Sequence, residues 1–318
     1  MKLGRREFLV GAAGLLASAG HTADTRTGEL PKRTLGRTKV PVSILGVGMA
    51  PLGSGHTSYA EAETLVRAAL DMGVTYVDVS PDYGDAEDKL KPVFRDKALR
   101  DRVFLVTKVN PSAPDATGVQ RQIENSLTRM GVDHIDAVHV HNLGDFDMAT
   151  VLGPGGTLAG LKEARRRGLI KYLGTSGHMR PPRFAQALET GDIDLTMNAL
   201  NFADRHTYDF EGLVLPVAKK HGTAVVAMKV LGGARDWRYD GHTPGTLADY
   251  HARAIRYSLG LPGVCVAVIG FGTVDEVRQA VAVARAYHPL SAAERAELLA
   301  EGKRLAQSRG LYYGPTEG

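Results

Sequence analysis

Residues 73–109, GVTYVDVSPDYGDAEDKLKPVFRDKALRDRVFLVTKV, contain two short runs of β-branched and aromatic residues with a helical pattern between them. The runs Tyr76 to Ser80 and Val103 to Val109 have the composition and length of strands, and the helical pattern begins near Ala86. Strands that alternate with helices pair in parallel through right-handed crossovers. This stretch is therefore expected to form one unit of a parallel sheet that is covered by helices.

The same alternation continues from residue 40 to the last quarter of the chain. The expected strands are Val42 to Gly48, Tyr76 to Ser80, Val103 to Val109, Ile135 to His141, Lys171 to Ser176, Leu195 to Asn201, Ala224 to Val230 and Val266 to Gly270. The expected helices begin near Tyr59, Ala86, Gly118, Gly156, Pro182, Gly212, Leu247 and Val274. Eight such units in about 245 residues match the size of a closed (β/α)8 TIM barrel, with a doubly wound sheet as the competing topology.

Two further elements flank the barrel pattern. Arg33-Thr34-Leu35 and Val40-Pro41-Val42 surround Gly36-Arg37, which predicts a β-hairpin that caps the bottom of the barrel. After Pro289, the stretch Ser291-Ala-Ala-Glu294 is a capping box and predicts one more helix at the C-terminal end. We therefore expect one α/β domain over residues 33–318.

The first nineteen residues have the pattern of a secretory signal. Met1 to Glu7 is basic, Phe8 to Leu16 is apolar or small, and Ala17-Ser18-Ala19 fits a cleavage site. The run Arg5-Arg6-Glu7-Phe8-Leu9 resembles a twin-arginine signal. Because the apolar run is too short for a membrane helix, we expect cleavage without a stable membrane anchor, and a linker over residues 20–32. These features predict export by the twin-arginine machinery to the periplasm or another extracytoplasmic compartment.

The composition is that of an ordinary globular protein, with 43% hydrophobic and 23% charged residues. Cys265 is the only cysteine, so no internal disulfide can form, and no Cys/His cluster has the spacing of a zinc site. The signal segment, with three basic residues and one Glu, carries +2 of the formal net charge of +4. The remaining charge does not indicate a nucleic-acid partner, and Arg165-Arg166-Arg167 is expected at a helix end, where cations complement the helix dipole.

Four polar residues lie where the expected strands end and the following loops begin. Asp78 lies in the second strand and Tyr83 in the loop after it, Lys108 ends the third strand, and His141 ends the fourth. Each residue alone has a simple structural explanation, because strand-end Lys and His are often solvated and a Tyr beside Gly often packs its ring. Catalytic residues of (β/α)8 barrels lie at the C-terminal ends of the strands. The four residues together therefore predict an active site.

These residue types suit proton delivery to a carbonyl oxygen while hydride arrives at the carbon. The ordinary pKa of tyrosine is about 10, so Tyr83 exchanges protons near neutrality only if a neighbouring cation stabilises its phenolate. Lys108 can supply that cation, and Asp78 can keep the buried lysine charged and oriented. Neutral His141 can donate a hydrogen bond to the substrate oxygen or relay its proton.

The chain resembles the aldo-keto reductase family, whose members are (β/α)8 barrels that use NAD(P)H. The likeness extends over essentially the whole mature chain, from Leu45-Gly-Val-Gly48 to Val268-Ile-Gly270. It assigns the catalytic tetrad of the family to Asp78, Tyr83, Lys108 and His141. The resemblance implies an oxidoreductase that transfers hydride between nicotinamide and a carbonyl or alcohol substrate, such as a sugar, with Tyr83 as general acid and base.

The resemblance also implies a set of cofactor-binding residues at strand ends and in the loops that follow. These are Gly48, Met49, Ser176, Gly177, Asn201, Lys229, Val230, Leu231, Gly232, Gly270, Phe271, Gly272, Thr273 and Glu276. Positions that usually hold the carboxamide read Gly177 and Met197 here, so those contacts are expected to be partly missing or replaced by His178 or Asn198. Gly272 stands where an Arg often pairs with the 2′-phosphate, which leaves NADP and NAD both open.

The loops after the fourth and seventh strands are expected to form the mouth of the barrel. Asn142, Trp237 and Tyr239 are the expected substrate-binding residues, because one Trp and one Tyr suit stacking on a sugar ring; packing aromatics are the equal alternative for the two rings. His139 shares a strand face with His141 but lies deeper, so packing inside the barrel is its expected role.

Two alternative functions stay open at this point. Soluble dinucleotides are not expected to be regenerated outside the cytoplasm, whereas a twin-arginine substrate crosses the membrane folded and could carry a bound cofactor with it. The first alternative is therefore a redox-neutral sugar epimerase, dismutase or lyase with tightly bound NAD(P). The second is a non-catalytic module that binds the cofactor, since a fold alone does not fix a function. The complete tetrad argues against this second alternative.

Overall fold

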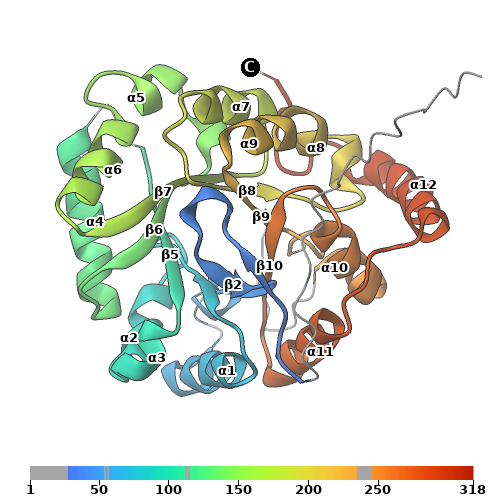
Figure 1. Ribbon diagram of the computed structural model, residues 1–318, viewed down its shortest axis with the longest axis horizontal. Helices are drawn as coiled ribbons and strands as arrows, with labels where there is room; N and C mark the ends of the chain where they lie inside the picture. The colour runs from blue at the N-terminus through green and yellow to red at the C-terminus, as the bar shows by residue number, and fades with distance from the viewer. Residues whose placement is uncertain (1–27, 54, 56, 112–114, 235–244, 318) are drawn as a thin grey trace, which may run out of the picture.

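The computed structural model describes residues 28–317 except positions 54, 56, 112–114 and 235–244. The expected signal segment and most of the linker lie outside the described residues, as do Trp237 and Tyr239. In Figure 1 the described chain forms one body, with strands at the centre and helices around them.

A closed barrel of eight parallel strands forms the centre (Figure 1). In chain order the strands are β3 (Leu45–Gly48), β4 (Tyr76–Asp78), β5 (Phe104–Val109), β6 (Ile135–Val140), β7 (Ile170–Gly177), β8 (Leu195–Ala199), β9 (Ala224–Met228) and β10 (Val264–Gly270). Each strand pairs with the next along the chain, and β10 pairs with β3. The (β/α)8 barrel is confirmed and the doubly wound sheet is excluded, because such a sheet has open edges.

The helices surround the barrel, and most begin at or within a few residues of the predicted positions. They are α1 (Tyr59–Asp71), α2 (Ala86–Phe94), α3 (Lys97–Asp101), α4 (Ala116–Met130), α5 (Met148–Leu152), α6 (Thr157–Arg166), α7 (Pro181–Glu189), α8 (Phe210–Leu213), α9 (Leu215–His221), α10 (His251–Leu259), α11 (Val274–Arg285) and α12 (Ala292–Arg309). In α4, Val119, Ile123 and Met130 form one buried stripe. The helix ends at Gly131, whose φ of 68° is a left-handed conformation that glycine adopts without strain.

The N-terminal hairpin closes the bottom of the barrel. Strands β1 (Lys32–Thr34) and β2 (Pro41–Ser43) pair antiparallel and lie in front of the barrel strands in Figure 1. Leu35 and Val42 are buried in the same cluster as barrel-interior residues such as Phe104. The predicted hairpin is therefore confirmed, and its apolar side chains complete the lower end of the core.

One predicted strand is wrong as a single element. The expected run from Val42 to Gly48 is split between β2 of the hairpin and β3 of the barrel. At Ile44 the chain changes partners: its amide donates to the carbonyl of Pro31, whereas its carbonyl accepts from the amide of Ala267 in β10. The apolar run is continuous in sequence because both halves are buried, so its periodicity does not reveal the change of sheet.

The C-terminal segment returns to the top of the barrel. The predicted capping box of α12 is present, because the Ser291 hydroxyl accepts from the amide of Glu294 and the Glu294 carboxylate accepts from the amide of Ser291. After α12, the Tyr208 hydroxyl donates to the carbonyl of Gly314 at 3.0 Å, and the Arg180 amide donates to the carbonyl of Pro315 at 3.2 Å. These bonds tie the tail to the loops that follow β7 and β8, at the C-terminal end of the barrel strands.

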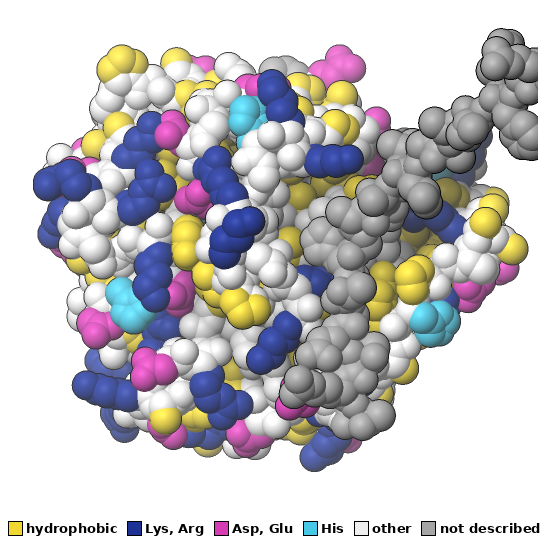
Figure 2. Space-filling view, in the orientation of Figure 1, with side chains coloured by type: hydrophobic (Ala, Val, Ile, Leu, Met, Phe, Trp, Pro, Cys, Tyr) yellow, Lys and Arg dark blue, Asp and Glu magenta, His cyan; other side chains and the backbone are white. Residues whose placement is uncertain are grey.

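Figure 2 shows the hairpin side of the molecule, where Lys and Arg side chains lie among Asp and Glu side chains. Each arginine of the Arg165-Arg166-Arg167 triplet, at the C-terminal end of α6, lies within 3.5 Å of a carboxylate. The triplet therefore forms ion pairs within the chain. Among the described residues, no helix has the length and apolar character that a membrane span requires.

Candidate active site

Three of the four predicted catalytic residues come from adjacent strands of the barrel. Asp78 ends β4, Lys108 lies near the end of β5, and His141 directly follows β6. All three are buried, and in the register of the sheet Lys108 lies opposite His139, the inward neighbour of His141. The alternation of side chains along parallel strands therefore brings the three groups to one place at the C-terminal end of the barrel, as the sequence predicts.

Lys108 and Asp78 form a buried ion pair. The Lys108 Nζ donates to both carboxylate oxygens of Asp78 and to the carbonyl of Val79, each at 2.8 Å. These three bonds use all three hydrogens of an ammonium group. Burial raises the pKa of Asp78 and lowers the pKa of Lys108, and each charge opposes the shift of the other. The arrangement holds a fixed ammonium whose own protons are all engaged.

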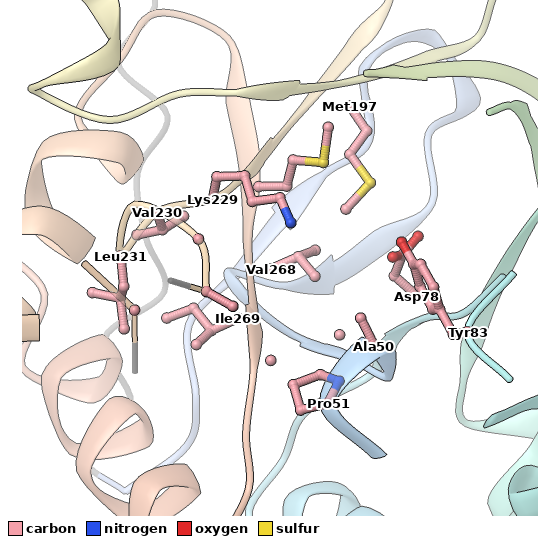
Figure 3. Close-up of a pocket in the computed structure, with 16 residues that line it drawn as sticks. Ala50, Pro51, Asp78, Tyr83, Met197, Lys229, Val230, Leu231, Val268 and Ile269 are labelled. Carbon is pink, nitrogen blue, oxygen red and sulfur yellow. The ribbon is translucent and has the colours of Figure 1, made fainter. Parts of the chain in front are cut away.

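Tyr83 lies in the loop after β4, against this ion pair. The Lys108 Nζ is 4.8 Å from the centre of the Tyr83 ring, and the rings of Tyr83 and His141 meet edge to face with their centres 6.0 Å apart. Figure 3 shows Tyr83 and Asp78 side by side on one wall of a cavity. A nearby positive charge stabilises negative charge on a phenol oxygen, so this geometry suits proton exchange at Tyr83.

Two glycines hold the loop that carries Tyr83. A Cβ at Gly53 would lie 1.6 Å from the carbonyl oxygen of Tyr83, and a Cβ at Gly84, whose φ is 59°, would lie 2.1 Å from the carbonyl oxygen of Gly53. The loop therefore packs backbone to backbone against η2 (Ala50–Leu52), the turn that follows β3. This close approach fixes the position of Tyr83 relative to Ala50 and Pro51, which line the same cavity.

The substitution Gly53→Ala is expected to lower turnover by about 100-fold, because its methyl group displaces the Tyr83 backbone and misplaces the hydroxyl. An overpacking cost of about 1–3 kcal/mol in the free energy of unfolding should accompany it. Gly55→Ala is the control, since Gly55 has a φ of 81° but no atom within 4 Å of its added Cβ. That control should lose some stability and keep its turnover, measured by steady-state kinetics and urea denaturation. Normal turnover in Gly53→Ala would show that the glycine contact does not position Tyr83.

His141 has partners that the sequence reasoning did not identify. Its Nδ1 lies 2.9 Å from Asp82 Oδ2 and 3.2 Å from Asn110 Oδ1. Burial lowers the pKa of His141, and the hydrogen bond from His141 lowers the pKa of Asp82. The pattern did contain a signal, because Asn110 is two residues after Lys108 and so shares its strand face, and Asp82 directly precedes Tyr83.

The cavity beside Tyr83 is lined by many of the expected cofactor residues. Gly48, Lys229, Val230, Leu231 and Gly270 line the same cavity as Asp78 and Tyr83. In Figure 3 the Lys229 amino group points into this cavity from the wall opposite Tyr83. Two further cavities hold other expected residues: one shares Leu231 with the first and is also lined by Phe271 and Glu276, and another is lined by Gly272 and Thr273. Both are also lined by residues at the start of α11, and we call the three cavities together the path.

The remaining expected cofactor residues support this path through packing and backbone bonds. Met49 is buried. The Ser176 hydroxyl lies 3.4 Å from the carbonyl of Val140, and a Cβ at Gly177 would meet the Phe184 ring at 2.7 Å. Asn201 donates to the carbonyl of Lys229 at 2.9 Å and accepts from two backbone amides. Asn201 therefore holds the segment Lys229 to Gly232, where Lys229 has a left-handed φ of 53°.

The shape and charge of the path fit a dinucleotide. A Cβ at Gly48 would lie 3.3 Å from Val268 and one at Gly270 would lie 2.7 Å from Pro51, so at these two positions the floor of the cavity is bare backbone. Close backbone approach of this kind suits a flat ring or a pyrophosphate. Lys229 supplies a positive charge above that floor, and α11 begins after Thr273 with its N-terminus at the end of the path. These residues would hold the nicotinamide, the phosphates and the adenosine in turn.

The expected replacements for the carboxamide contacts lie apart from one another. Met197 lines the cavity, whereas Asn198 points to the other side of β8, where its side-chain oxygen accepts from Thr196 at 3.0 Å. His178 stacks on Tyr313 of the C-terminal tail, with ring centres 5.2 Å apart. Tyr313 gave no signal in the sequence, because only the path of the tail over the barrel brings it to the site.

Of the expected substrate residues, Asn142 lies within the described chain. It has a left-handed φ of 47° and lines a cavity with His178 and Tyr313. Trp237 and Tyr239 fall outside the described residues. His139 is fully buried below His141 and packs over Gly174, where a Cβ would lie 2.1 Å from its ring. His139 therefore packs inside the barrel and does not reach the cavity.

Comparison with known proteins shows which proteins this chain is similar to in sequence and in fold. The sequence model of the aldo/keto reductase family matches residues 44–248. Pyridoxal 4-dehydrogenase of Microbacterium luteolum is 28% identical over 79% of this chain and 92% of its own length, and L-galactose dehydrogenase of Arabidopsis thaliana is 24% identical over 79% and 86%. The crystal structure of an aldo/keto reductase from Klebsiella pneumoniae in complex with NADP and acetate is 25% identical, with a TM-score of 0.66 over 90% of this chain and 96% of that one.

Proposed function

This chain belongs to the aldo/keto reductase family and is therefore an NAD(P)H-dependent oxidoreductase. We propose that Tyr83 gives a proton to the carbonyl oxygen of the substrate in reduction and takes the hydroxyl proton of the alcohol in oxidation. The observation that carries the proposal is the position of Tyr83: its ring lies 4.8 Å from a fixed ammonium and lines the cavity of the expected cofactor residues. A tyrosine in this position combines proton exchange with access to both reactants.

Each residue has a separate task in the proposed reaction. When bound, NAD(P) accepts or supplies hydride, that is, a hydrogen with its electron pair. In the oxidising direction the hydroxyl proton of the alcohol passes to Tyr83 Oη, the C–H hydrogen leaves with both bonding electrons, and a C=O bond forms. Lys108 stabilises negative charge on Tyr83 without giving up a proton, since its three hydrogens bind Asp78 and Val79. Reduction is the reverse of these steps.

We propose a small polar aldehyde or the corresponding alcohol, of the sugar class, as the substrate. The cavity on the substrate side is lined by Asn142, His178 and Tyr313, which combine an aromatic face with polar groups. Sugars are bound by such a combination, because their C–H faces stack on rings and their hydroxyls bond polar groups. The name of one relative refers to galactose, which is a sugar, and the name of another refers to pyridoxal, which is a small polar aldehyde.

The experiment is a turnover assay with both cofactors and in both directions. The purified full chain is mixed with NAD+ or NADP+ and a panel of sugar alcohols, and separately with NADH or NADPH and the matching aldoses, while absorbance at the nicotinamide band is followed. We expect a net change of cofactor that matches the product formed, and none without substrate. Conversion of a sugar with no net change of cofactor would contradict the proposal and establish the redox-neutral alternative.

A further inference from the structure

The segment that follows β9 has a backbone conformation that depends on its surroundings. Lys229, Gly232 and Gly233 have left-handed φ values of 53°, 82° and 77°. For Lys229, which carries a Cβ, such a φ is unfavourable and persists only where neighbouring groups hold the chain in place. Leu231 and Gly233 line the same cavity as Tyr83, so the shape of this segment decides what fits beside the tyrosine.

The segment pairs with a second piece of backbone. The amide of Thr246 donates to the carbonyl of Gly233 at 3.0 Å, and the amide of Leu247 donates to the carbonyl of Leu231 at 2.9 Å. Gly245, in the second piece, also lines the cavity. We call these two arms together the stem: residues 231–233 and 245–247. The stem therefore forms part of the wall of the expected cofactor site.

Arg309, the last residue of α12, bridges the two arms of the stem. Its Nη2 donates to the carbonyl of Gly232 at 3.0 Å, and its Nη1 donates to the hydroxyl of Thr246. The Thr246 hydroxyl donates in turn to the Gly232 carbonyl at 3.1 Å. Because a guanidinium is planar and presents its hydrogens in fixed directions, one side chain holds both arms at a fixed separation.

Asp204, in the loop after β8, fixes the guanidinium. Its carboxylate oxygens accept from Arg309 Nε at 2.8 Å and from Arg309 Nη2 at 3.1 Å, which is a two-point contact. Both side chains are buried, with exposed fractions of 9% for Arg309 and 2% for Asp204. Asn201 Nδ2 also donates to Asp204, and the Tyr313 hydroxyl lies 2.9 Å from Asp204 Oδ2. The pair thus has the close geometry and the additional hydrogen bonds that a buried ion pair needs.

We propose that Asp204 and Arg309 position the cofactor, because they hold the stem in the arrangement that receives NAD(P). The end of the C-terminal helix then belongs to the cofactor site although it acts through the stem. Asp204 and Arg309 are therefore positioning residues. The inference rests on the cofactor role that the proposed function gives to the cavity.

This role predicts a loss of cofactor affinity without a loss of turnover. When only a fraction of the molecules has the binding arrangement, the Kd rises by the inverse of that fraction. At saturating cofactor the bound molecules all have the arrangement, so the turnover number is kept. A defect that displaced the catalytic groups would instead lower the turnover number and leave the Kd unchanged.

The test is the variant Arg309→Lys, which separates the bridge from the charge. Lysine keeps a positive charge beside Asp204, but its three hydrogens lie on one nitrogen and do not reproduce the guanidinium fork. We expect the Kd of NADH or NADPH to rise about tenfold, as when the binding arrangement falls to about a tenth of the molecules, and the turnover number at saturating cofactor to stay within about threefold. Fluorescence titration and steady-state kinetics on the full chain measure the two quantities.

Arg100→Lys is the matched control, because it changes a similar buried pair near the starts of β5 and β6. Arg100 pairs with Asp136 at 3.0 Å, with exposed fractions of 8% and 9%, and donates to the carbonyls of Val103 and His134. In urea denaturation this control should lose about as much stability as Arg309→Lys, and its cofactor Kd should be that of the wild type. An equal rise of the Kd in both variants would overturn the proposal, since general loss of stability would then explain it.

Thr246→Val is a milder second variant, because it keeps the buried ion pair and removes only the hydroxyl that joins the arms. Its Kd should rise about threefold, as when the arrangement falls to about a third of the molecules. A wild-type Kd in Arg309→Lys would overturn the proposal. If Arg309→Lys did not fold, a wild-type Kd in Thr246→Val would overturn it instead. Absence of sugar turnover in the wild type would refute the proposed function, whereas the Kd values would still decide whether Asp204 and Arg309 position the cofactor.

Discussion

The substitution Tyr83→Phe is expected to lower the turnover number by about 100- to 10,000-fold, which is the usual contribution of a positioned proton donor. The change removes one hydroxyl and keeps the ring that lies 4.8 Å from the Lys108 Nζ. Cofactor affinity should stay within about threefold of the wild type, because the cavity floor is built from Gly48 and Gly270 rather than from the Tyr83 hydroxyl. Steady-state kinetics and fluorescence titration with NAD(P)H measure the two quantities.

The chain offers a matched control for this prediction. Tyr59 on α1 also has a lysine near its ring, since the Lys89 Nζ is 5.5 Å from the ring centre, but Tyr59 is 48% exposed and outside the cavity. Tyr59→Phe should therefore keep wild-type turnover and melting temperature. If Tyr83→Phe also kept turnover within a few-fold of wild type, another group would have to exchange the substrate proton and the assigned role of Tyr83 would be wrong.

The fold could be predicted because its signal is repeated. Each strand is buried on both faces and reads as a short apolar run, and each helix shows one apolar stripe, so eight copies of a simple pattern reinforce one another. The single strand expected from Val42 to Gly48 failed for the same reason. Both β2 and β3 are buried there, and continuous burial hides the point at Ile44 where the chain leaves the hairpin for the barrel.

The meeting of three predicted site residues could be predicted because parallel strands bring their C-terminal ends together. Asp78, Lys108 and His141 each lie at a strand end, so their meeting follows from topology and needs no knowledge of distances. Tyr313 could not be predicted in this way, since it reaches His178 only through the path of the tail after α12. The sequence did place Asn110 on the strand face of Lys108 and Asp82 next to Tyr83. Only the structure shows that the side chains of Asp82 and Asn110 both turn towards one ring nitrogen of His141.

The second large effect is expected at the Asp78–Lys108 ion pair. Asp78→Leu leaves the Lys108 ammonium buried without its carboxylate, which should lower the free energy of unfolding by about 3–5 kcal/mol. The double variant Asp78→Leu with Lys108→Met removes both charges and should recover most of that loss. Turnover should be lost in both variants, because the single variant no longer has the carboxylate that holds Lys108 in place and the double variant has no cation beside Tyr83. Urea denaturation and steady-state kinetics measure the two effects.

The pH dependence of the single variant separates an unpaired charge from a simple packing defect. Without Asp78, the buried Lys108 binds its proton less tightly than it does in the unfolded chain, so stability rises with pH wherever the unfolded state holds more protons. The deficit of Asp78→Leu should therefore shrink as pH is raised towards the ordinary pKa of lysine, about 10.4. The double variant should show no such trend, and Glu163→Gln, which breaks the exposed pair with Arg166, should change stability little at any pH. Equal and pH-independent losses in the single and double variants would mean that the site is held by shape alone, because only an unpaired ammonium makes the loss depend on protons.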